Sequence, residues 1–109
     1  MTTSTPKIRP WQIRVAYVKF PDKPKKGNSR PVLILAVDDD FAYGLKITTK
    51  NSDKYARIKL DHEKLGLEKP SWLQLDPIHM IPLSKVRDFI SKVPLDLAET
   101  INEKMAETN

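Results

Sequence analysis

The stretch PKKGNSRPVLILAV, residues 24–37, decides the fold that we predict for this chain. Its second half, PVLILAV, is apolar on both faces, which is typical of a buried strand, and its leading proline is tolerated at a strand's first residue. Residues 21–30 contain two prolines, a glycine and four basic side chains, so we expect a loop there. This loop ends at Arg30, directly before the most hydrophobic segment of the chain.

Short strands are predicted on both sides of this segment. Alternating or apolar runs mark five of them: residues 11–20, 43–50, 55–60, 71–75 and 78–82. The apolar face of the first run switches near Val18, which indicates a bulge or a bend. About six short strands joined by tight turns favour a small closed or half-closed barrel, because closure removes exposed strand edges.

After residue 82 the period of the apolar residues changes. A helix is predicted near 84–93, from the spacing of Val86, Phe89, Ile90 and Val93. A second helix is predicted near 96–106, from the stripe of Leu97, Ile101 and Met105. We therefore expect a mainly β domain over residues 10–107 with these C-terminal helices, preceded by a flexible tail at 1–9.

Length and composition exclude several classes of protein. A chain of 109 residues is expected to form one domain. The absence of cysteine rules out a disulfide framework and suits a reducing compartment. No apolar run reaches the ~18 residues of a membrane span, and the first residues lack the apolar core of a signal peptide. We therefore expect a cytoplasmic protein that does not bind membranes.

The positive charge is concentrated in one half of the chain. Residues 1–60 contain 13 Lys and Arg against 5 Asp and Glu, a net charge of +8. Residues 61–109 contain 6 against 9, a net charge of −3. The first half is a candidate surface for a polyanion such as nucleic acid, since lysine and arginine displace counterions from phosphates. A basic protein with no such partner has the same charge pattern.

The sequence contains little that indicates a metal site or a nucleotide-binding site. There are two histidines, His62 in a charged loop and His79 on a predicted strand, and both are interpreted as structural. The acidic run at residues 38–40 is interpreted as a solvated turn, so no metal site or cofactor is predicted. Phosphate-binding glycine motifs are absent.

The strand GLKITTK, residues 44–50, carries the chemistry that remains. Successive side chains of a strand point to opposite faces, so Leu45 and Ile47 on the core leave three polar side chains together on the other face. These side chains are Lys46, Thr48 and Lys50. A hydroxyl between two ammonium groups suits a phosphodiester, although an ordinary exposed strand face has the same pattern.

These residues, in this order, resemble a known family. The unit Arg30-Pro31-Val32-Leu33-Ile34-Leu35 after a basic loop is similar to the "RPVLVL" signature of PemK/MazF-type toxins from toxin–antitoxin pairs. The pair Ile47-Thr48 falls where that family has its "IT" strand, and residues 66–71 are similar to its later portion. The resemblance extends from Trp11 to about Met105.

The resemblance implies a small SH3-like barrel of the PemK/MazF/CcdB type, and usually a homodimer. It implies an endoribonuclease that cleaves single-stranded RNA by attack of the substrate's own 2′-hydroxyl, without a metal. It also implies a cognate antitoxin protein as partner. The family's essential arginine corresponds to Arg30, which would stabilise the phosphorane, and its essential threonine corresponds to Thr48, which would orient the scissile phosphate.

Further residues are predicted to contact RNA around this pair. They are Lys25, Lys26, Asn28, Ser29, Lys46, Lys50, Ser71 and Gln74. The chain also departs from the family pattern. It has Pro10-Trp11-Gln12 where members commonly have a Gly-Asp or Gly-Glu pair, and it has Gln74, close to Asp76, where some members have an arginine.

Two other functions share the same fold. One is a non-catalytic SH3-like module that binds RNA or DNA, since a fold does not determine a function. The other is a toxin directed at gyrase, like CcdB, which would depend on its C-terminal residues. The C-terminal sequence EKMAETN, residues 103–109, is polar and does not favour the second alternative.

Overall fold

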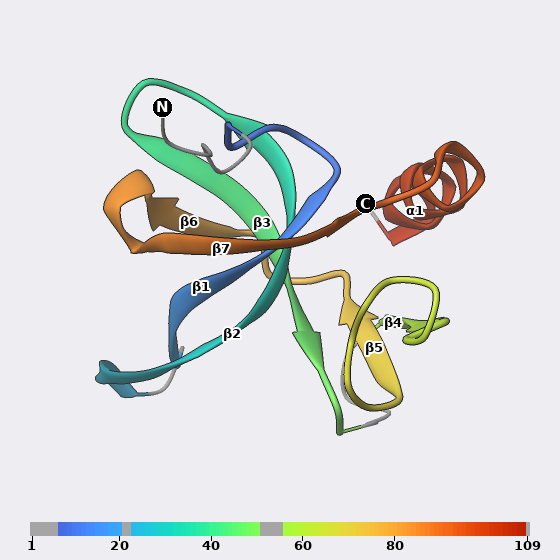
Figure 1. The fold of residues 1–109 in the computed structure, drawn as a ribbon, viewed down its shortest axis with the longest axis horizontal. Helices are drawn as coiled ribbons and strands as arrows, with labels where there is room; N and C mark the ends of the chain where they lie inside the picture. The colour runs from blue at the N-terminus through green and yellow to red at the C-terminus, as the bar shows by residue number, and fades with distance from the viewer. Residues whose placement is uncertain (1–6, 21–22, 51–55, 109) are drawn as a thin grey trace, which may run out of the picture.

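The computed structural model describes residues 7–20, 23–50 and 56–108, apart from the side chains of 19–20, 23–27 and 108. Seven strands are followed by one helix (Figure 1). The elements are β1 Gln12–Phe20, β2 Lys23–Val37, β3 Phe41–Thr48, β4 Arg57–Leu60, β5 Ser71–Gln74, β6 His79–Pro82, the 3₁₀ turn η1 Leu83–Lys85, β7 Val86–Lys92 and α1 Leu95–Thr108.

The strands form one antiparallel sheet in the order β4-β5-β3-β2-β1-β7, and β6 pairs with β3 as well. Strand β3 changes partners along its length. It pairs with β2 up to Lys46, which lies opposite Val32. On the edge away from β2 it pairs with β6 as far as Gly44 and with β5 from Ile47, which lies opposite Leu73. Strands β2 and β3 therefore separate after Lys46, as their diverging ribbons show (Figure 1).

One core fills the concave side of a half-closed barrel. Strands β7, β1, β2, β3 and β6 curl around it, and η1 links β6 to β7. Its buried residues are Ala16, Val18, Val32, Ile34, Ala42, Ile81 and Val86. The predicted fold class, a mainly β chain with a small SH3-like barrel, is confirmed, although the path of paired strands stays open.

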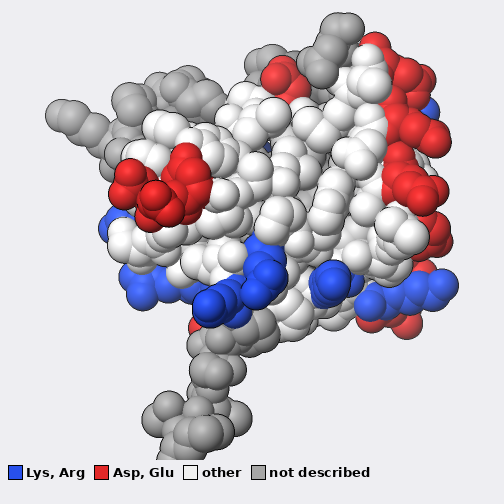
Figure 2. Space-filling model, turned by 90° about the horizontal axis from the view of Figure 1, so that it is seen from above, with Lys and Arg blue, Asp and Glu red and all other residues white. Residues whose placement is uncertain are grey.

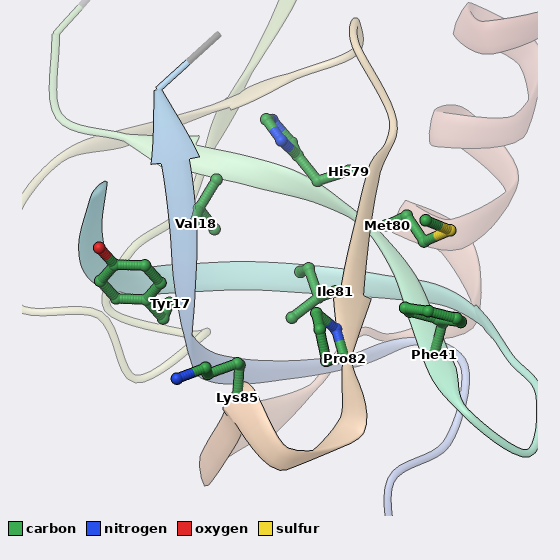
Figure 3. A pocket seen from close by; sticks show the side chains of 8 residues that line it. All are labelled: Tyr17, Val18, Phe41, His79, Met80, Ile81, Pro82 and Lys85. Atoms are coloured by element: carbon green, nitrogen blue, oxygen red, sulfur yellow. The ribbon is translucent and has the colours of Figure 1, made fainter. Parts of the chain in front are cut away.

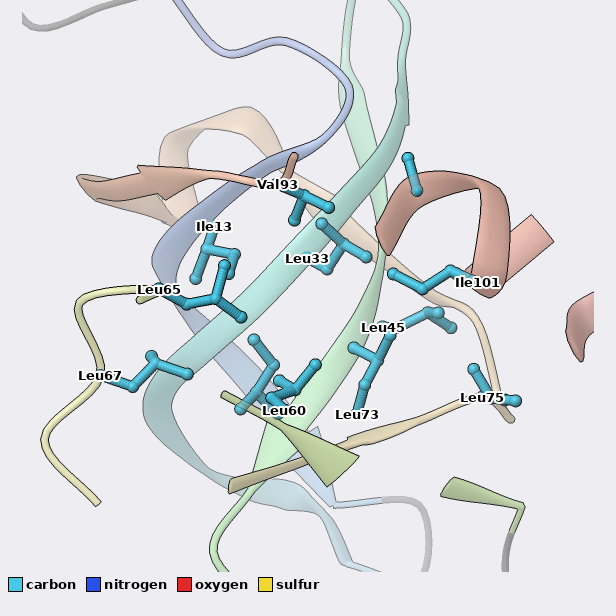
Figure 4. Packing of buried hydrophobic residues seen from close by; sticks show 12 residues of the cluster. Ile13, Leu33, Leu45, Leu60, Leu65, Leu67, Leu73, Leu75, Val93 and Ile101 are labelled. Atoms are coloured by element: carbon cyan, nitrogen blue, oxygen red, sulfur yellow. The ribbon is translucent and has the colours of Figure 1, made fainter. Parts of the chain in front are cut away.

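A second core lies on the opposite face of the same strands. Here β5, the turn segment 61–67 and α1 cover the apolar side chains of β1, β2 and β3 (Figure 4). Leu33, Leu45 and Ile101 are among its fully buried members. Helix α1 has 14 residues, and none of the helices in the described part of the chain is long and apolar enough to span a membrane.

The helix predicted near 84–93 is wrong, because this segment forms η1 and strand β7. The apolar spacing that indicated a helix comes from a strand whose pairing with β1 is interrupted by register shifts.

A buried cation, Arg14, lies at the pairing of β1 with β7. Arg14 Nη1 donates a hydrogen bond to the carbonyl oxygen of Arg87 (2.9 Å), and its guanidinium lies 5.8 Å from the ring centroid of Phe89.

The loop predicted at 21–30 is also wrong for residues 23–30, which belong to β2. They pair with β1 on one side, where Arg30 lies opposite Ala16 and Gly27 lies opposite Lys19. The pairing with β3 begins only at Val32, so this part of β2 is a sheet edge. Proline and glycine are tolerated at an edge, because one row of backbone groups needs no partner strand.

The entry to β1 is held in an unusual conformation. Trp11 has a φ of 67°, in the left-handed region that favours glycine. Its N–H donates to the Ile34 carbonyl (2.7 Å), and its own carbonyl accepts from Val93 N–H (2.8 Å). Residues 1–6 of the predicted tail lie outside the described residues, whereas Ile8 packs against the barrel core.

Substitution of two nearby isoleucines should change the stability of the fold by different amounts, because only one of them lies in the barrel core. Ile81 is 2% exposed and Ile78 is 52% exposed. Ile81→Ala should lower the free energy of unfolding by about 2–5 kcal/mol, because it leaves a cavity inside the barrel. Ile78→Ala is the matched control and should cost less than about 1 kcal/mol. Urea denaturation of both variants checks this, and equal losses would contradict the described barrel interior.

Candidate functional site

A hollow of about 480 Å³ lies where β2 and β3 separate. It has a cationic lining, and β4 contributes one of the cations. The described lining residues are Asn28, Arg30, Pro31, Lys46, Ile47, Thr48, Thr49, Lys50 and Arg57. The site therefore sits where β2 leaves β3, next to the part of β3 that pairs with β5 on its other edge.

The barrel's inward-facing rows supply the polar groups of this hollow. Arg30 is two residues before the buried Val32 on β2, so it continues the same row. Lys46 and Thr48 likewise continue the row that starts at the buried Ala42 on β3. The open end of the apolar barrel is therefore lined by charged and hydroxyl side chains instead of aliphatic ones.

The hydroxyl of Thr48 is positioned for donation. Thr48 is buried, and its Oγ1 accepts a hydrogen bond from Lys50 N–H at 3.2 Å. The oxygen thereby uses one of its acceptor sites, and the hydroxyl proton stays available for an acceptor in the hollow. Thr49, on the other face of the chain, is exposed.

Arg57 is a lining residue that the sequence analysis did not single out. It lies opposite Gln74 in the β4–β5 pairing. Its Nη2 donates to Gln74 Oε1 at 3.1 Å, and its Nη1 donates to the Lys50 carbonyl oxygen. Both acceptors are neutral, so these bonds orient the guanidinium without cancelling its charge. The alternation of residues 55–60 placed Arg57 on a strand, but only the register with β5 places it in the hollow.

The cations of the hollow are close enough to influence one another. Burial lowers the pKa of Lys46 from its usual value, and the charges of Arg30 and Arg57 lower that pKa further. Burial also lowers the pKa of Arg30. A site that holds several cations together in this way is prepared for an anionic ligand, because the ligand relieves their mutual repulsion.

His79 lines a neighbouring hollow and is not among the described lining residues of the cationic one. The second hollow, of about 300 Å³, is lined by aromatic and apolar side chains that include Tyr17, Phe41 and Met80. Figure 3 shows His79 at one end of it, close to Val18, with Lys85 at the other end. Burial lowers the pKa of His79 from its usual value, and the charges of Lys46 and Arg30 lower it further.

The structure brings together only some of the residues predicted to bind RNA. Asn28, Lys46 and Lys50 line the cationic hollow with Arg30 and Thr48. Ser29 is exposed and is not a lining residue. Lys25 and Lys26 are on β2, but their side chains lie outside the described residues.

The other two predicted residues have structural contacts. Ser71 is buried, donates to the Lys69 carbonyl oxygen (2.7 Å), and lines a different hollow next to Gly66 and Leu67. Gln74 is 3% exposed, accepts from Arg57, and donates from Nε2 to the Asp76 carbonyl oxygen (2.8 Å). Gln74 therefore reaches the hollow only through the arginine that it holds.

Charges of opposite sign are also separated on the face of the molecule that Figure 2 shows. Figure 2 shows acidic side chains gathered along the edge of the molecule near α1, and Lys and Arg along another edge. Helix α1 carries Asp96, Glu99, Glu103 and Glu107. Among the described residues, no group of His, Cys, Asp and Glu is arranged to hold a metal ion. The arrangement can bind phosphate groups through guanidinium, ammonium and hydroxyl donors.

Comparison with known proteins points to one family. A family model described as a PemK-like, MazF-like toxin of type II toxin–antitoxin systems matches residues 11–108. Among the solved structures, 34 chains match, and one of them is the toxin MazF-mt6 of Mycobacterium tuberculosis. That match has a TM-score of 0.71 and 23% sequence identity, and it covers 88% of this chain and 93% of the other. A search of curated proteins finds no match.

The crowding of cations predicts that the site destabilises the fold. Because the pKa of Lys46 is lowered in the folded chain, the unfolded chain holds this proton more tightly. At pH 7 the ammonium therefore reduces the free energy of unfolding, and Lys46→Met should raise it by up to about 1 kcal/mol. Urea denaturation at low salt checks this, and added salt should shrink the gain.

Lys50→Met is the matched control, because Lys50 lines the same hollow but is exposed. It should change the free energy of unfolding by less than about 0.5 kcal/mol. A loss of stability in Lys46→Met would show that Lys46 stabilises the fold and would contradict the repulsion argued here.

Proposed function

The chain belongs to the PemK-like, MazF-like toxins of type II toxin–antitoxin systems, and we propose that it is an endoribonuclease that cleaves single-stranded RNA without a metal. Membership of this family gives the chain a cognate antitoxin as partner. The observation that carries the proposal is the shared hollow of Arg30, Lys46 and Thr48 at the open end of the barrel. A ribonuclease of this kind needs only to align a phosphodiester and to stabilise added negative charge.

RNA brings its own nucleophile to such a site. The 2′-hydroxyl attacks the adjacent phosphorus, the bond to the 5′-oxygen breaks, and a 2′,3′-cyclic phosphate remains. In this reaction Arg30 binds two phosphate oxygens with its planar guanidinium, which a lysine cannot copy. Its main role is electrostatic stabilisation of the phosphorane. Thr48 donates its free hydroxyl proton to the scissile phosphate and so fixes its orientation.

The remaining cations hold the strand that is being cut. Lys46 is on β3, Lys50 follows two residues after the end of that strand, and Arg57 is on β4. These three positive groups can bind successive phosphates, and Asn28 offers an amide to a base or a sugar. The site needs an RNA segment that fits between two separating strands, which favours a single strand over a duplex.

The antitoxin is expected to inhibit by covering this hollow with acidic side chains. A homodimer is implied by the family resemblance and a cytoplasmic location is expected from the composition, and both remain expectations. The contact positions Lys25, Lys26, Ser29, Ser71 and Gln74 remain predictions too, with Gln74 now assigned to the support of Arg57.

Cleavage itself is the first test. Purified protein with excess EDTA should cut a long unstructured RNA into discrete fragments that end in a 2′,3′-cyclic phosphate and begin with a 5′-hydroxyl. Arg30→Ala should lower the cleavage rate about 10²–10³-fold, as expected for loss of one group that stabilises an oxyanion. Gel electrophoresis and mapping of fragment ends measure both results.

Arg87→Ala is the matched control, because Arg87 is an exposed arginine on β7 outside the hollow. It should cleave at the wild-type rate. A single 2′-deoxy substitution at the mapped bond should protect that bond alone. Intact RNA with the wild-type protein, together with salt-sensitive binding, would overturn the nuclease and leave a binding module.

The number of phosphates bound gives a second test. Affinity for an uncleavable single-stranded oligodeoxynucleotide should fall with salt, with a slope of about −0.7 per phosphate neutralised in a plot of log K against log salt. Arg57→Met should make this slope shallower by about 0.7, because one phosphate contact is lost. Gln74→Leu, which removes the acceptor of Arg57 Nη2, should weaken binding in the same direction but less. Fluorescence anisotropy measures each slope, and an unchanged slope in Arg57→Met would remove Arg57 from the interface.

A further inference from the structure

His79 is on β6, and its side chain faces the inside of the barrel, as do those of Arg30 on β2 and Lys46 on β3. It is two residues before the buried Ile81 on β6, so its side chain continues the barrel's interior row. Its partner across the β3–β6 pairing is Gly44, which has no side chain. A Cβ on Gly44 would lie 2.7 Å from the Leu33 carbonyl oxygen, so this position stays open. The next inward position on β3 is Lys46, diagonal to His79 and within reach of a long side chain.

Two charges act on the imidazole of His79. They are Lys46 on β3 and Arg30 on β2. Tyr17 on β1 and Lys85 on η1 line the same hollow as His79, farther along it. The described residues that line the two hollows include no carboxylate. Such surroundings favour the neutral imidazole, which has a lone pair to offer.

One ring nitrogen of His79 is left unsatisfied in the part of the chain that the structure describes. Nε2 of His79 is buried and has no hydrogen-bond partner among the described residues. A buried polar atom without a partner is costly, and each one in a native protein calls for an explanation, such as a catalytic role, an ordered water or an ion. Arg30, Lys46 and Thr48, which line the cationic hollow, offer hydrogen-bond donors. His79 can accept a hydrogen bond at its unpartnered nitrogen.

We propose that His79 is the general base of the cleavage reaction, accepting the proton of the attacking 2′-hydroxyl at Nε2. The inference rests on the ribonuclease function proposed above and supplies the group that function lacks. The hydroxyl proton moves to the imidazole as the bond between the 2′-oxygen and phosphorus forms. The bond from phosphorus to the 5′-oxygen breaks, and that oxygen takes a proton from water. The hydroxide left behind removes the proton from the imidazolium and restores the neutral base.

The other polar groups of the site suit this role less well. Arg30 keeps its proton over the working range of an enzyme. Thr48 needs a base of its own to accept a proton, and its Oγ1 already accepts from Lys50 N–H. Lys46 is held as a cation beside the phosphate. Of these four side chains, only the imidazole of His79 has an ordinary pKa close to neutral pH.

The experiment compares pH–rate profiles under single-turnover conditions in EDTA, with a short RNA that contains the mapped cleavage site. For wild type, the rate should rise with pH as His79 loses its proton and reach a plateau, because only the neutral imidazole accepts a proton. The lowered pKa of His79 puts that rise below the pH at which an ordinary histidine titrates. His79→Gln should lose the rise and cleave about 10²–10⁴-fold more slowly. Its affinity for the uncleavable oligodeoxynucleotide should stay within about threefold of wild type.

His62→Gln is the matched control, since His62 is the only other histidine in the chain and lies on the turn segment 61–67. It should keep the wild-type rate and profile. His79→Ala with added imidazole is the second variant, and imidazole should restore cleavage in proportion to its neutral form. A structural role for His79 would give no such rescue.

The outcomes separate the two proposals. Wild-type protein that leaves the RNA intact overturns both. Wild-type cleavage with an unchanged rate and pH profile in His79→Gln overturns only the general base. If His79→Gln does not fold, the rescue of His79→Ala decides, and its absence in a folded His79→Ala protein also overturns the general base.

Discussion

The separation of β2 from β3 after Lys46 is the constraint on which the rest of the structure depends. Backbone groups of a buried strand must be hydrogen-bonded, and on its other edge β3 is paired first with β6 and then, from Ile47, with β5. The two faces of the strands carry the two cores, and the separation opens the barrel at one end. Arg30, Lys46 and Arg57 are therefore brought to the hollow by paired strands.

The same geometry explains which parts of the site could be predicted from the sequence. Alternation alone placed Lys46 and Thr48 on one face, because the period of a strand is two and Leu45 had to face a core. The partnership of Arg57 and Gln74 depends on the register between β4 and β5, which the sequence does not encode in any local pattern. His79 was interpreted as structural for the same reason, since its strand was foreseen but its neighbours were not.

The two errors in secondary structure have related physical causes. Residues 84–93 carry apolar side chains at a spacing that fits a helix, but irregular pairing with β1 lets a strand use the same side chains. Residues 23–30 contain proline and glycine, which usually mark a loop, yet a sheet edge accepts both. In both cases pairing with a neighbouring strand outweighs the local preference for a helix or a loop. Tertiary contacts commonly change the structure that a short sequence pattern favours. The C-terminal helix, at Leu95–Thr108 where one was predicted near 96–106, depends less on neighbours because its stripe needs only one apolar surface.

The two tryptophans, Trp11 and Trp72, can serve as fluorescent reporters of two different parts of the structure. Trp11 connects β2 to β7 through its backbone and packs against the second core, so its emission follows the integrity of the fold. Trp72 lies opposite Thr48 in the sheet, with the ammonium of Lys59 5.8 Å from its ring centroid, so its emission follows the charge and hydration beside the hollow. Replacing Trp72 with phenylalanine would leave Trp11 to report folding, and replacing Trp11 would leave Trp72 to report occupancy of the hollow. The two processes could then be followed in two single-tryptophan variants without attaching a dye.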